Sequence, residues 1–142
     1  MKNEITKTVQ NLVSEYGTND PFELADALGI LIMPSKAIKG CTMNLLGYPV
    51  IFLGEDLNDF ERRYVCAHEL AHNVLHDIKQ YDLLIHSTFF NEGKVEVEAD
   101  TFAAELLISD DVSIKYPGFT LEQVAASENV PLELVKLKFE LS

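Results

Sequence analysis

Basic residues are scarce in this sequence. Its 142 residues include 11 lysines and arginines against 23 aspartates and glutamates, which gives a net charge of -12 at pH 7. A surface that binds nucleic acid needs clustered lysine and arginine side chains to neutralise phosphates. We therefore expect no direct binding to nucleic acid, and an acidic surface that favours solubility.

Cysteines and long apolar runs are also few. The two cysteines, Cys41 and Cys66, lie far apart in the sequence and form no Cys-x-x-Cys pair, so we expect two reduced, partly buried thiols. The first residues lack the apolar stretch of a signal peptide. No apolar run approaches the roughly 20 residues that span a bilayer. We expect a cytoplasmic protein with no membrane contact.

The length and the 47% hydrophobic content predict one globular domain over residues 1–142. Asn58 followed three residues later by Glu61 forms a capping box, which marks the start of a long helix. The fold class that the pattern predicts is α+β: a single compact domain with a small antiparallel sheet packed against several helices. The hydrophobic periodicity predicts helices over 5–16, 20–28, 59–79, 95–108, 120–127 and 131–139, strands over 30–33 and on both sides of a turn at 46–48, and a loop over 80–93.

The segment 68–72 reads His-Glu-Leu-Ala-His within one of these helices. Two histidines four residues apart lie on the same helix face, so His68 and His72 can bind one ion, and Zn²⁺ is the usual occupant of such a site. Glu69 lies about 100° around the helix from His68, beside the ion, where it can take a proton from water during hydrolysis. The motif predicts a zincin-like active-site helix. The alternative, a surface helix with incidental histidines, is disfavoured by the apolar residues around the motif.

A catalytic zinc site needs a third protein ligand, and no third histidine stands at the spacing of HExxHxxGxxH. His76 lies about 12 Å from His68 along the helix axis, so we expect it either to contact a ligating histidine in the second shell or simply to end the helix. Glu96 and Asp100 share a face of the next helix, which predicts Glu96 as the third ligand and Asp100 as the partner of a ligating imidazole. Glu98 lies about 200° around from Glu96 and remains the alternative ligand. Both acids could instead be solvated.

Two sequence runs resemble the ImmA/IrrE family of metallopeptidases: HELAHNVLH at 68–76 and EVEADTFAAELL at 96–107. The strand YPVIFL at 48–53 and the acidic EDL at 55–57 are similar to that family as well. The resemblance implies that His68, His72 and Glu96 bind zinc and that Glu69 is catalytic. It also implies a substrate class, because family members commonly sit beside a helix-turn-helix repressor of a prophage or mobile element, and cleave or antagonise it.

Other parts of the catalytic site are less determined by the sequence. The tetrahedral intermediate of peptide hydrolysis needs an electrophile besides the metal, and Tyr64, Tyr81 and His86 are candidate donors. The strand 49–53 is a candidate for pairing with an extended substrate at a sheet edge. The resemblance has one departure, Leu-Leu-Ile-Ser at 106–109 where Leu-Leu-Met-Pro is common. We expect this change at a helix end to affect packing and not chemistry.

The helical pair at about 119–140 has the look of a helix-turn-helix. Its second helix carries only Lys136 and Lys138 against Glu133 and Glu140, so we expect it to cap the fold or meet a protein partner instead of reading DNA. The activity predicted for the whole chain is zinc-dependent cleavage of a cytoplasmic protein, a helix-turn-helix repressor. The alternatives are an anti-repressor that holds zinc but acts by binding alone, and a toxin-antitoxin component.

Overall fold

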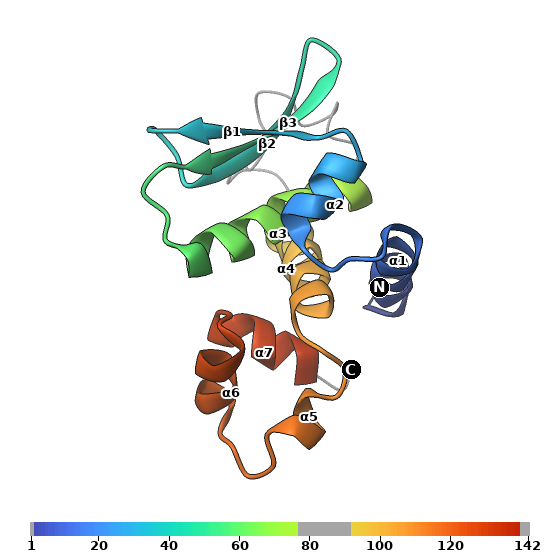
Figure 1. The fold of residues 1–142 in the computed structure, drawn as a ribbon, viewed down its shortest axis with the longest axis vertical. Helices are drawn as coiled ribbons and strands as arrows, with labels where there is room; N and C mark the ends of the chain where they lie inside the picture. The colour runs from blue at the N-terminus through green and yellow to red at the C-terminus, as the bar shows by residue number, and fades with distance from the viewer. Residues whose placement is uncertain (1, 77–91, 140–142) are drawn as a thin grey trace.

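The computed structural model of the protein describes residues 2–76 and 92–139. Within these ranges the chain forms seven helices and three strands, which confirms the α+β class (Figure 1). The elements are α1 (Lys2–Tyr16), α2 (Pro21–Ala27), β1 (Leu31–Ser35), β2 (Gly40–Leu45), β3 (Tyr48–Gly54), α3 (Asp59–Leu75), α4 (Glu92–Leu107), α5 (Val112–Lys115), α6 (Leu121–Glu128) and α7 (Leu132–Phe139).

The three strands form one sheet in the order β1-β3-β2. β2 and β3 pair antiparallel as expected, but β1 pairs with β3 in parallel, so the sheet is mixed and not purely antiparallel. The reason is the connection after β1, which carries the chain past the position of β3 before β2 and β3 form their hairpin. β3 is therefore the central strand. Its backbone has partners on both sides, which contradicts the expectation that residues 49–53 offer a free edge to a substrate.

The first strand was expected to end at residue 33, yet β1 continues through Pro34 to Ser35. Proline lacks the N–H that a central strand needs for its ladder, and it is tolerated on edge strands, where one side of the backbone has no strand partner. β1 is such an edge strand.

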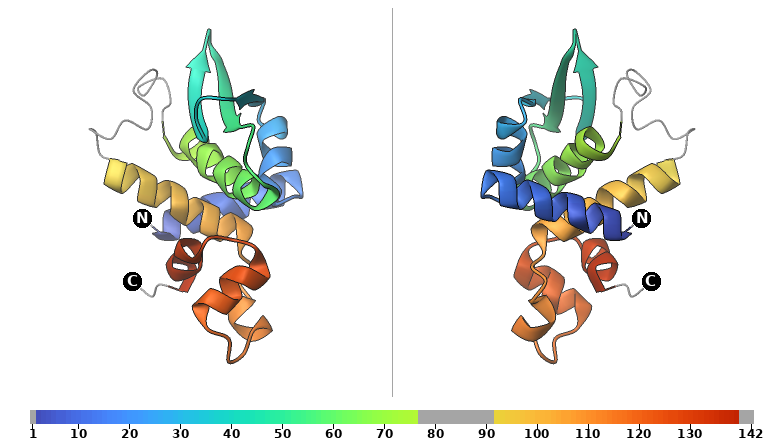
Figure 2. Two further views of the ribbon diagram at one scale, coloured as in Figure 1. Left: turned by 90° about the vertical axis from the view of Figure 1, so that its left-hand side faces the viewer. Right: turned by 90° about the vertical axis from the view of Figure 1, so that its right-hand side faces the viewer.

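The helices lie in layers beneath the sheet (Figures 1 and 2). α3 contacts both β2 and β3, and α4 packs against α3. α1 and α7 pack in turn against α4, and the helices α5–α7 form the end of the molecule opposite the sheet. The long helix α3 is thus held between the sheet and α4, the arrangement that brings the motif on α3 toward acids on α4.

Small side chains are buried on both α3 and α4, the two helices that pack together. Ala67 and Ala71 on α3, and Ala99 and Ala103 on α4, are completely buried. Each pair is spaced by four residues and therefore lies on one helix face. The core around this contact includes Phe102, also completely buried. Next to these alanines in the sequence, the histidines on α3 meet the acids on α4.

Several helix ends differ from the sequence-based expectation. The capping box of Asn58 and Glu61 opens α3 as predicted. However, α3 ends at Leu75, before the expected residue 79, because the backbone of His76 is extended. α4 begins at Glu92, before the expected residue 95, and the single turn α5 was not predicted. The C-terminal pair forms as α6 and α7. Among the described residues, no helix is long and apolar enough to cross a membrane.

Candidate metal centre

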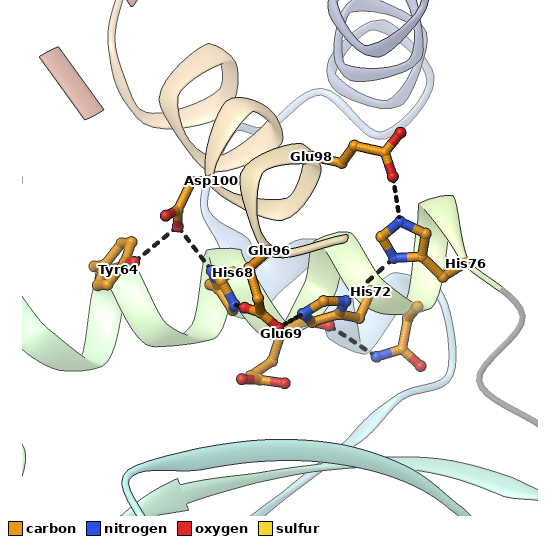
Figure 3. Close-up of polar contacts among 9 residues, drawn as sticks. Tyr64, His68, Glu69, His72, His76, Glu96, Glu98 and Asp100 are labelled. Carbon is orange, nitrogen blue, oxygen red and sulfur yellow. Dashed lines mark hydrogen bonds and ion pairs between the residues drawn. The ribbon is translucent and has the colours of Figure 1, made fainter. Parts of the chain in front are cut away.

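Three side chains from α3 and α4 converge on one point between these helices (Figure 3). One ligand atom from each of His68, His72 and Glu96 lies within 4.8 Å of the others. The Glu96 carboxylate spans the two imidazoles, with Oε2 at 2.5 Å from Nε2 of His68 and Oε1 at 3.1 Å from Nε2 of His72. Both histidines therefore present Nε2 to the same carboxylate, which is the arrangement expected of a shared ion site.

His68 is held from its other side by a second acid. Its Nδ1 lies 2.8 Å from Oδ1 of Asp100, and the Tyr64 hydroxyl donates to the same oxygen at 2.7 Å. Burial acts to lower the pKa of His68, but the hydrogen bonds to Asp100 and Glu96 outweigh it and raise that pKa to about 10. Burial and the charge of Asp100 raise the pKa of Tyr64, so its hydroxyl stays a donor.

His72 has a different environment. Burial keeps its pKa below the ordinary value, against the opposing effect of the Glu96 hydrogen bond. Its Nδ1 lies 3.1 Å from Nδ1 of His76, and Nε2 of His76 lies 2.9 Å from Oε1 of Glu98. Glu98 thus points away from the convergent cluster and contacts the histidine at the end of α3.

Glu69 lies beside this cluster and points from α3 toward the sheet (Figure 3). It is only 3% exposed. β2 passes directly above it: a Cβ added at Gly40 would lie 3.4 Å from Oε2 of Glu69 and would collide with Val65 Cγ1 at 2.3 Å. Burial, and then the charge of Glu69, raise the pKa of the nearby Cys41 thiol to about 11. A glycine at position 40 is therefore what lets the strand approach the carboxylate.

Two polar residues that the sequence analysis missed join β2 to the motif helix. The Asn73 side-chain amide donates to Oγ1 of Thr42 at 2.6 Å and to the backbone oxygen of Glu69 at 3.0 Å. Thr42 is completely buried, and its hydroxyl donates to the Val50 oxygen at 3.2 Å. An asparagine in an apolar helix segment was the available signal, since a buried amide needs partners. The pair fixes β2 over Glu69.

The donor set fits zinc. Two imidazole nitrogens and one carboxylate oxygen are ligands of the kind found in catalytic zinc sites, which keep a fourth position for water. Tetrahedral bonds of about 2.0–2.1 Å would space these ligand atoms by about 3.3 Å, and the atoms here are already gathered within 4.8 Å. The acids Glu69, Glu96 and Asp100 around two histidines also supply the negative charge that attracts a divalent cation.

The remaining predicted site residues are the candidate partners of the two motif histidines and the candidate oxyanion donors. His76 lies at the end of α3 against His72, and Asp100 lies against His68. The hydroxyl of Tyr64, one of three candidate oxyanion donors, is engaged with Asp100. The other two candidates, Tyr81 and His86, lie outside the described residues.

Comparison with known proteins gives matches over most of the chain. A peptidase family model, described as the IrrE N-terminal-like domain, matches residues 25–140. "Uncharacterized immunity region protein 2" of Bacillus phage phi105 is 38% identical over 139 residues, which cover 94% of this chain and 88% of that protein. "Metallopeptidase ImmA" of Bacillus subtilis (strain 168) is 31% identical over 137 residues, 89% of this chain and 79% of that protein.

Proposed function

The chain belongs to the ImmA/IrrE family of metallopeptidases, and from this membership we propose that it is a zinc-dependent endopeptidase that cleaves a cytoplasmic helix-turn-helix repressor. The observation that carries the proposal is the convergence of His68, His72 and Glu96 within 4.8 Å beside the buried Glu69. A binding protein has no need of a buried acid next to a ligand cluster, whereas hydrolysis needs a base there.

In this proposal His68, His72 and Glu96 hold zinc, which when bound supplies a Lewis acid that polarises the scissile carbonyl and lowers the pKa of water. Asp100 fixes the orientation of the His68 ring through its Nδ1, at 2.8 Å. Tyr64 donates to the same Asp100 oxygen and holds the carboxylate in place.

Glu69 is the proposed general base. It takes a proton from the attacking water and later donates that proton to the leaving amine, so that one residue serves both steps. Its position between α3 and β2 keeps it largely out of contact with solvent, at 3% exposure. The Asn73–Thr42 link holds the strand and the helix together at this point.

The edge of β2 is the proposed place for the substrate backbone. Among the described strands β2 pairs only with β3, and it passes over Glu69 at Gly40. An extended segment added beside β2 would receive main-chain hydrogen bonds and lie next to the base. This edge replaces the central strand β3, which the sequence had suggested for the same role.

A repressor as the substrate is supported by the relative named for a phage immunity region. The helical pair α6–α7 is proposed to contact protein and not DNA. Lys138, one of its two basic residues in the last turn, has a largely buried side chain and is paired with Asp110 at 2.6 Å and with Glu105 at 3.4 Å. Little positive charge is left there to bind phosphates.

Zinc analysis and a cleavage assay on matched variants test the proposal. We expect about one zinc per chain in the parent protein and in Glu69→Gln, and none in Glu96→Ala, because only the last substitution removes a ligand. Cleavage of a purified repressor from the same genetic neighbourhood should fall at least about 100-fold in Glu69→Gln. Absence of zinc from the parent after metal-replete purification would refute the proposal. Zinc binding with repressor inhibition but no cleavage, equal in parent and Glu69→Gln, would show an anti-repressor.

A further inference from the structure

We propose that Glu98 and His76 are positioning residues that hold Nδ1–H of His72 and thereby aim its Nε2 at the metal. This inference deepens the proposed function and rests on its zinc site. It assigns a role to Glu98, the acid that does not join the ligand cluster, and chooses between the two roles that the sequence left open for His76.

The two ring nitrogens of His72 face different partners. Its Nε2 lies 3.1 Å from Oε1 of Glu96 and is the atom on the side of the cluster, whereas its Nδ1 lies 3.1 Å from Nδ1 of His76 (Figure 3). A neutral imidazole carries one N–H. When Nε2 is used as a metal ligand, the proton of His72 therefore resides on Nδ1, facing His76.

The contacts of His76 determine which of its ring nitrogens carries the proton. To accept from Nδ1–H of His72, His76 must leave its own Nδ1 without a proton, which places its single proton on Nε2. That atom lies 2.9 Å from Oε1 of Glu98, an oxygen that accepts hydrogen bonds. One proton arrangement is thus compatible with both hydrogen bonds, His72–His76 and His76–Glu98, and the acceptor oxygen of Glu98 favours it.

Both zinc histidines are then oriented by a carboxylate, but by different routes. Asp100 contacts His68 directly at 2.8 Å, while Glu98 acts on His72 through an intervening histidine. The side chains of His76 and Glu98 are only 9% and 19% exposed, so water competes weakly for these hydrogen bonds. Outer partners of this kind usually change metal affinity by about 10- to 100-fold when they are removed.

A simpler role for the same contacts is to stabilise the C-terminal end of α3, since His76 is the C-cap residue of that helix. Zinc affinity and histidine tautomers separate the two roles. We expect ¹⁵N NMR of the zinc-loaded parent to show His76 as the neutral Nε2–H tautomer. Either the Nδ1–H tautomer or a doubly protonated ring would overturn the proposal, because neither can accept from His72.

Chelator competition on folded protein then measures zinc affinity. We expect His76→Phe and Glu98→Leu each to weaken zinc binding by about 10- to 100-fold, and the double variant to be no weaker than His76→Phe alone, since Glu98 acts through His76. Glu98→Gln, which keeps an acceptor oxygen, should lie closer to the parent. Glu122→Leu, an exposed acid on α6, is the control for the charge change and should match the parent.

The outcomes distinguish this inference from the proposed function. A parent without zinc refutes the zinc site itself. A parent that binds zinc and loses it in Glu96→Ala, but whose His76→Phe and Glu98→Leu variants bind within about twofold of it, refutes the relay alone. Additive losses in the double variant would also refute it, because the two residues would then act independently.

Discussion

Four carboxylates lie on or around the histidine-bearing helix α3, and the neighbours of each carboxylate decide what it can do. Glu96 faces both imidazoles and is placed to bind an ion. Asp100 contacts the ring nitrogen of His68 that faces away from the candidate ion site, Glu98 contacts a ring nitrogen of His76, and both are placed to orient rings. Glu69 faces the strand β2 and is placed for a base. Residue type alone does not separate these roles; the partner atoms do.

Cys41 gives a residue-scale test of the charge on Glu69. Burial, and then that charge, raise the pKa of the Cys41 thiol to about 11, so roughly one thiol in a thousand is ionised at pH 8. Because only the thiolate reacts, we expect slow labelling of zinc-free protein by a thiol reagent. Glu69→Gln should lower the pKa and speed labelling at a fixed pH, as measured by the pH dependence of the labelling rate.

The second cysteine provides the internal control. Cys66 is completely buried, and burial is the main cause that raises its pKa to about 12, so it should stay unlabelled in the native protein of both forms. The same pH profile for Cys41 in parent and Glu69→Gln would mean that no charge on Glu69 acts on this thiol. A faster rate for Cys66 would instead indicate that the variant has opened its core.

At the scale of elements, the sequence predicted best what depends on local chemistry. The capping box at Asn58 correctly predicted the start of α3, and the four-residue spacings of the motifs predicted which side chains share a face. The parallel pairing of β1 was missed because local alternation does not encode strand order. α5 was missed because one turn shows no periodicity, and its N-cap residue Asp111 makes no side-chain capping bond.

In the candidate site, too, the sequence predicted some contacts and missed others. The convergence of His68, His72 and Glu96 was predicted from the spacing of residues along each helix and from the assumption that the two helices pack together. The contacts of Glu98 with His76 and of Asn73 with Thr42 depend on how α4 and β2 cross α3. Spacing within a single helix cannot give a crossing geometry, so these outer contacts were beyond what the sequence could predict.

The β2–β3 hairpin carries an unfavourable residue at its turn, which gives an element-scale prediction. Leu46 has φ of 52° and Gly47 has φ of 87°, and the Leu46 side chain is 92% exposed. Asparagine tolerates this left-handed backbone better than leucine does. We expect Leu46→Asn to raise the free energy of unfolding by about 0.5–1 kcal/mol, measured by chemical denaturation.

The matched control for this prediction is Leu46→Ala. Alanine removes the same exposed apolar side chain but has no preference for the left-handed region, so it should bring no comparable gain. Equal stabilisation by alanine and asparagine would mean that removal of exposed apolar surface, and not backbone conformation, determines the effect.

At the scale of the whole molecule, α3 joins the sheet to the helices. It contacts β2, β3, α2 and α4, so the candidate site lies on an element that packs against both kinds of secondary structure. α4 in turn contacts α1 and α7. The chain as a single domain over residues 1–142 remains a prediction, and cooperative unfolding is its test: one domain should unfold in a single transition by all probes.

Arg63 is the residue that ties α3 to the far end of this molecule. Its guanidinium donates to the backbone oxygens of Leu107, at the end of α4, and of Glu128 and Asn129, at the end of α6, at 3.3–3.4 Å. These carbonyls are the ones that a helix leaves unsatisfied, and they carry partial negative charge. Arg63→Ala should therefore lower the free energy of unfolding by about 1–2 kcal/mol, measured by chemical denaturation.

Which helices lose stability in Arg63→Ala tests whether the two ends of the molecule fold as one unit. Arg63→Lys keeps the charge but has no planar fork of donors, so it should recover only part of the stability. Hydrogen exchange should show less protection in α6 and α7 while the proposed zinc binding at His68 and His72 is retained, since the substitution leaves the candidate ligands in place. A second unfolding transition in Arg63→Ala would mean that the C-terminal helices are a separate unit held to α3 by this contact. An unchanged unfolding midpoint would mean that these long hydrogen bonds contribute nothing measurable, and that packing of α7 against α4 alone joins the two ends.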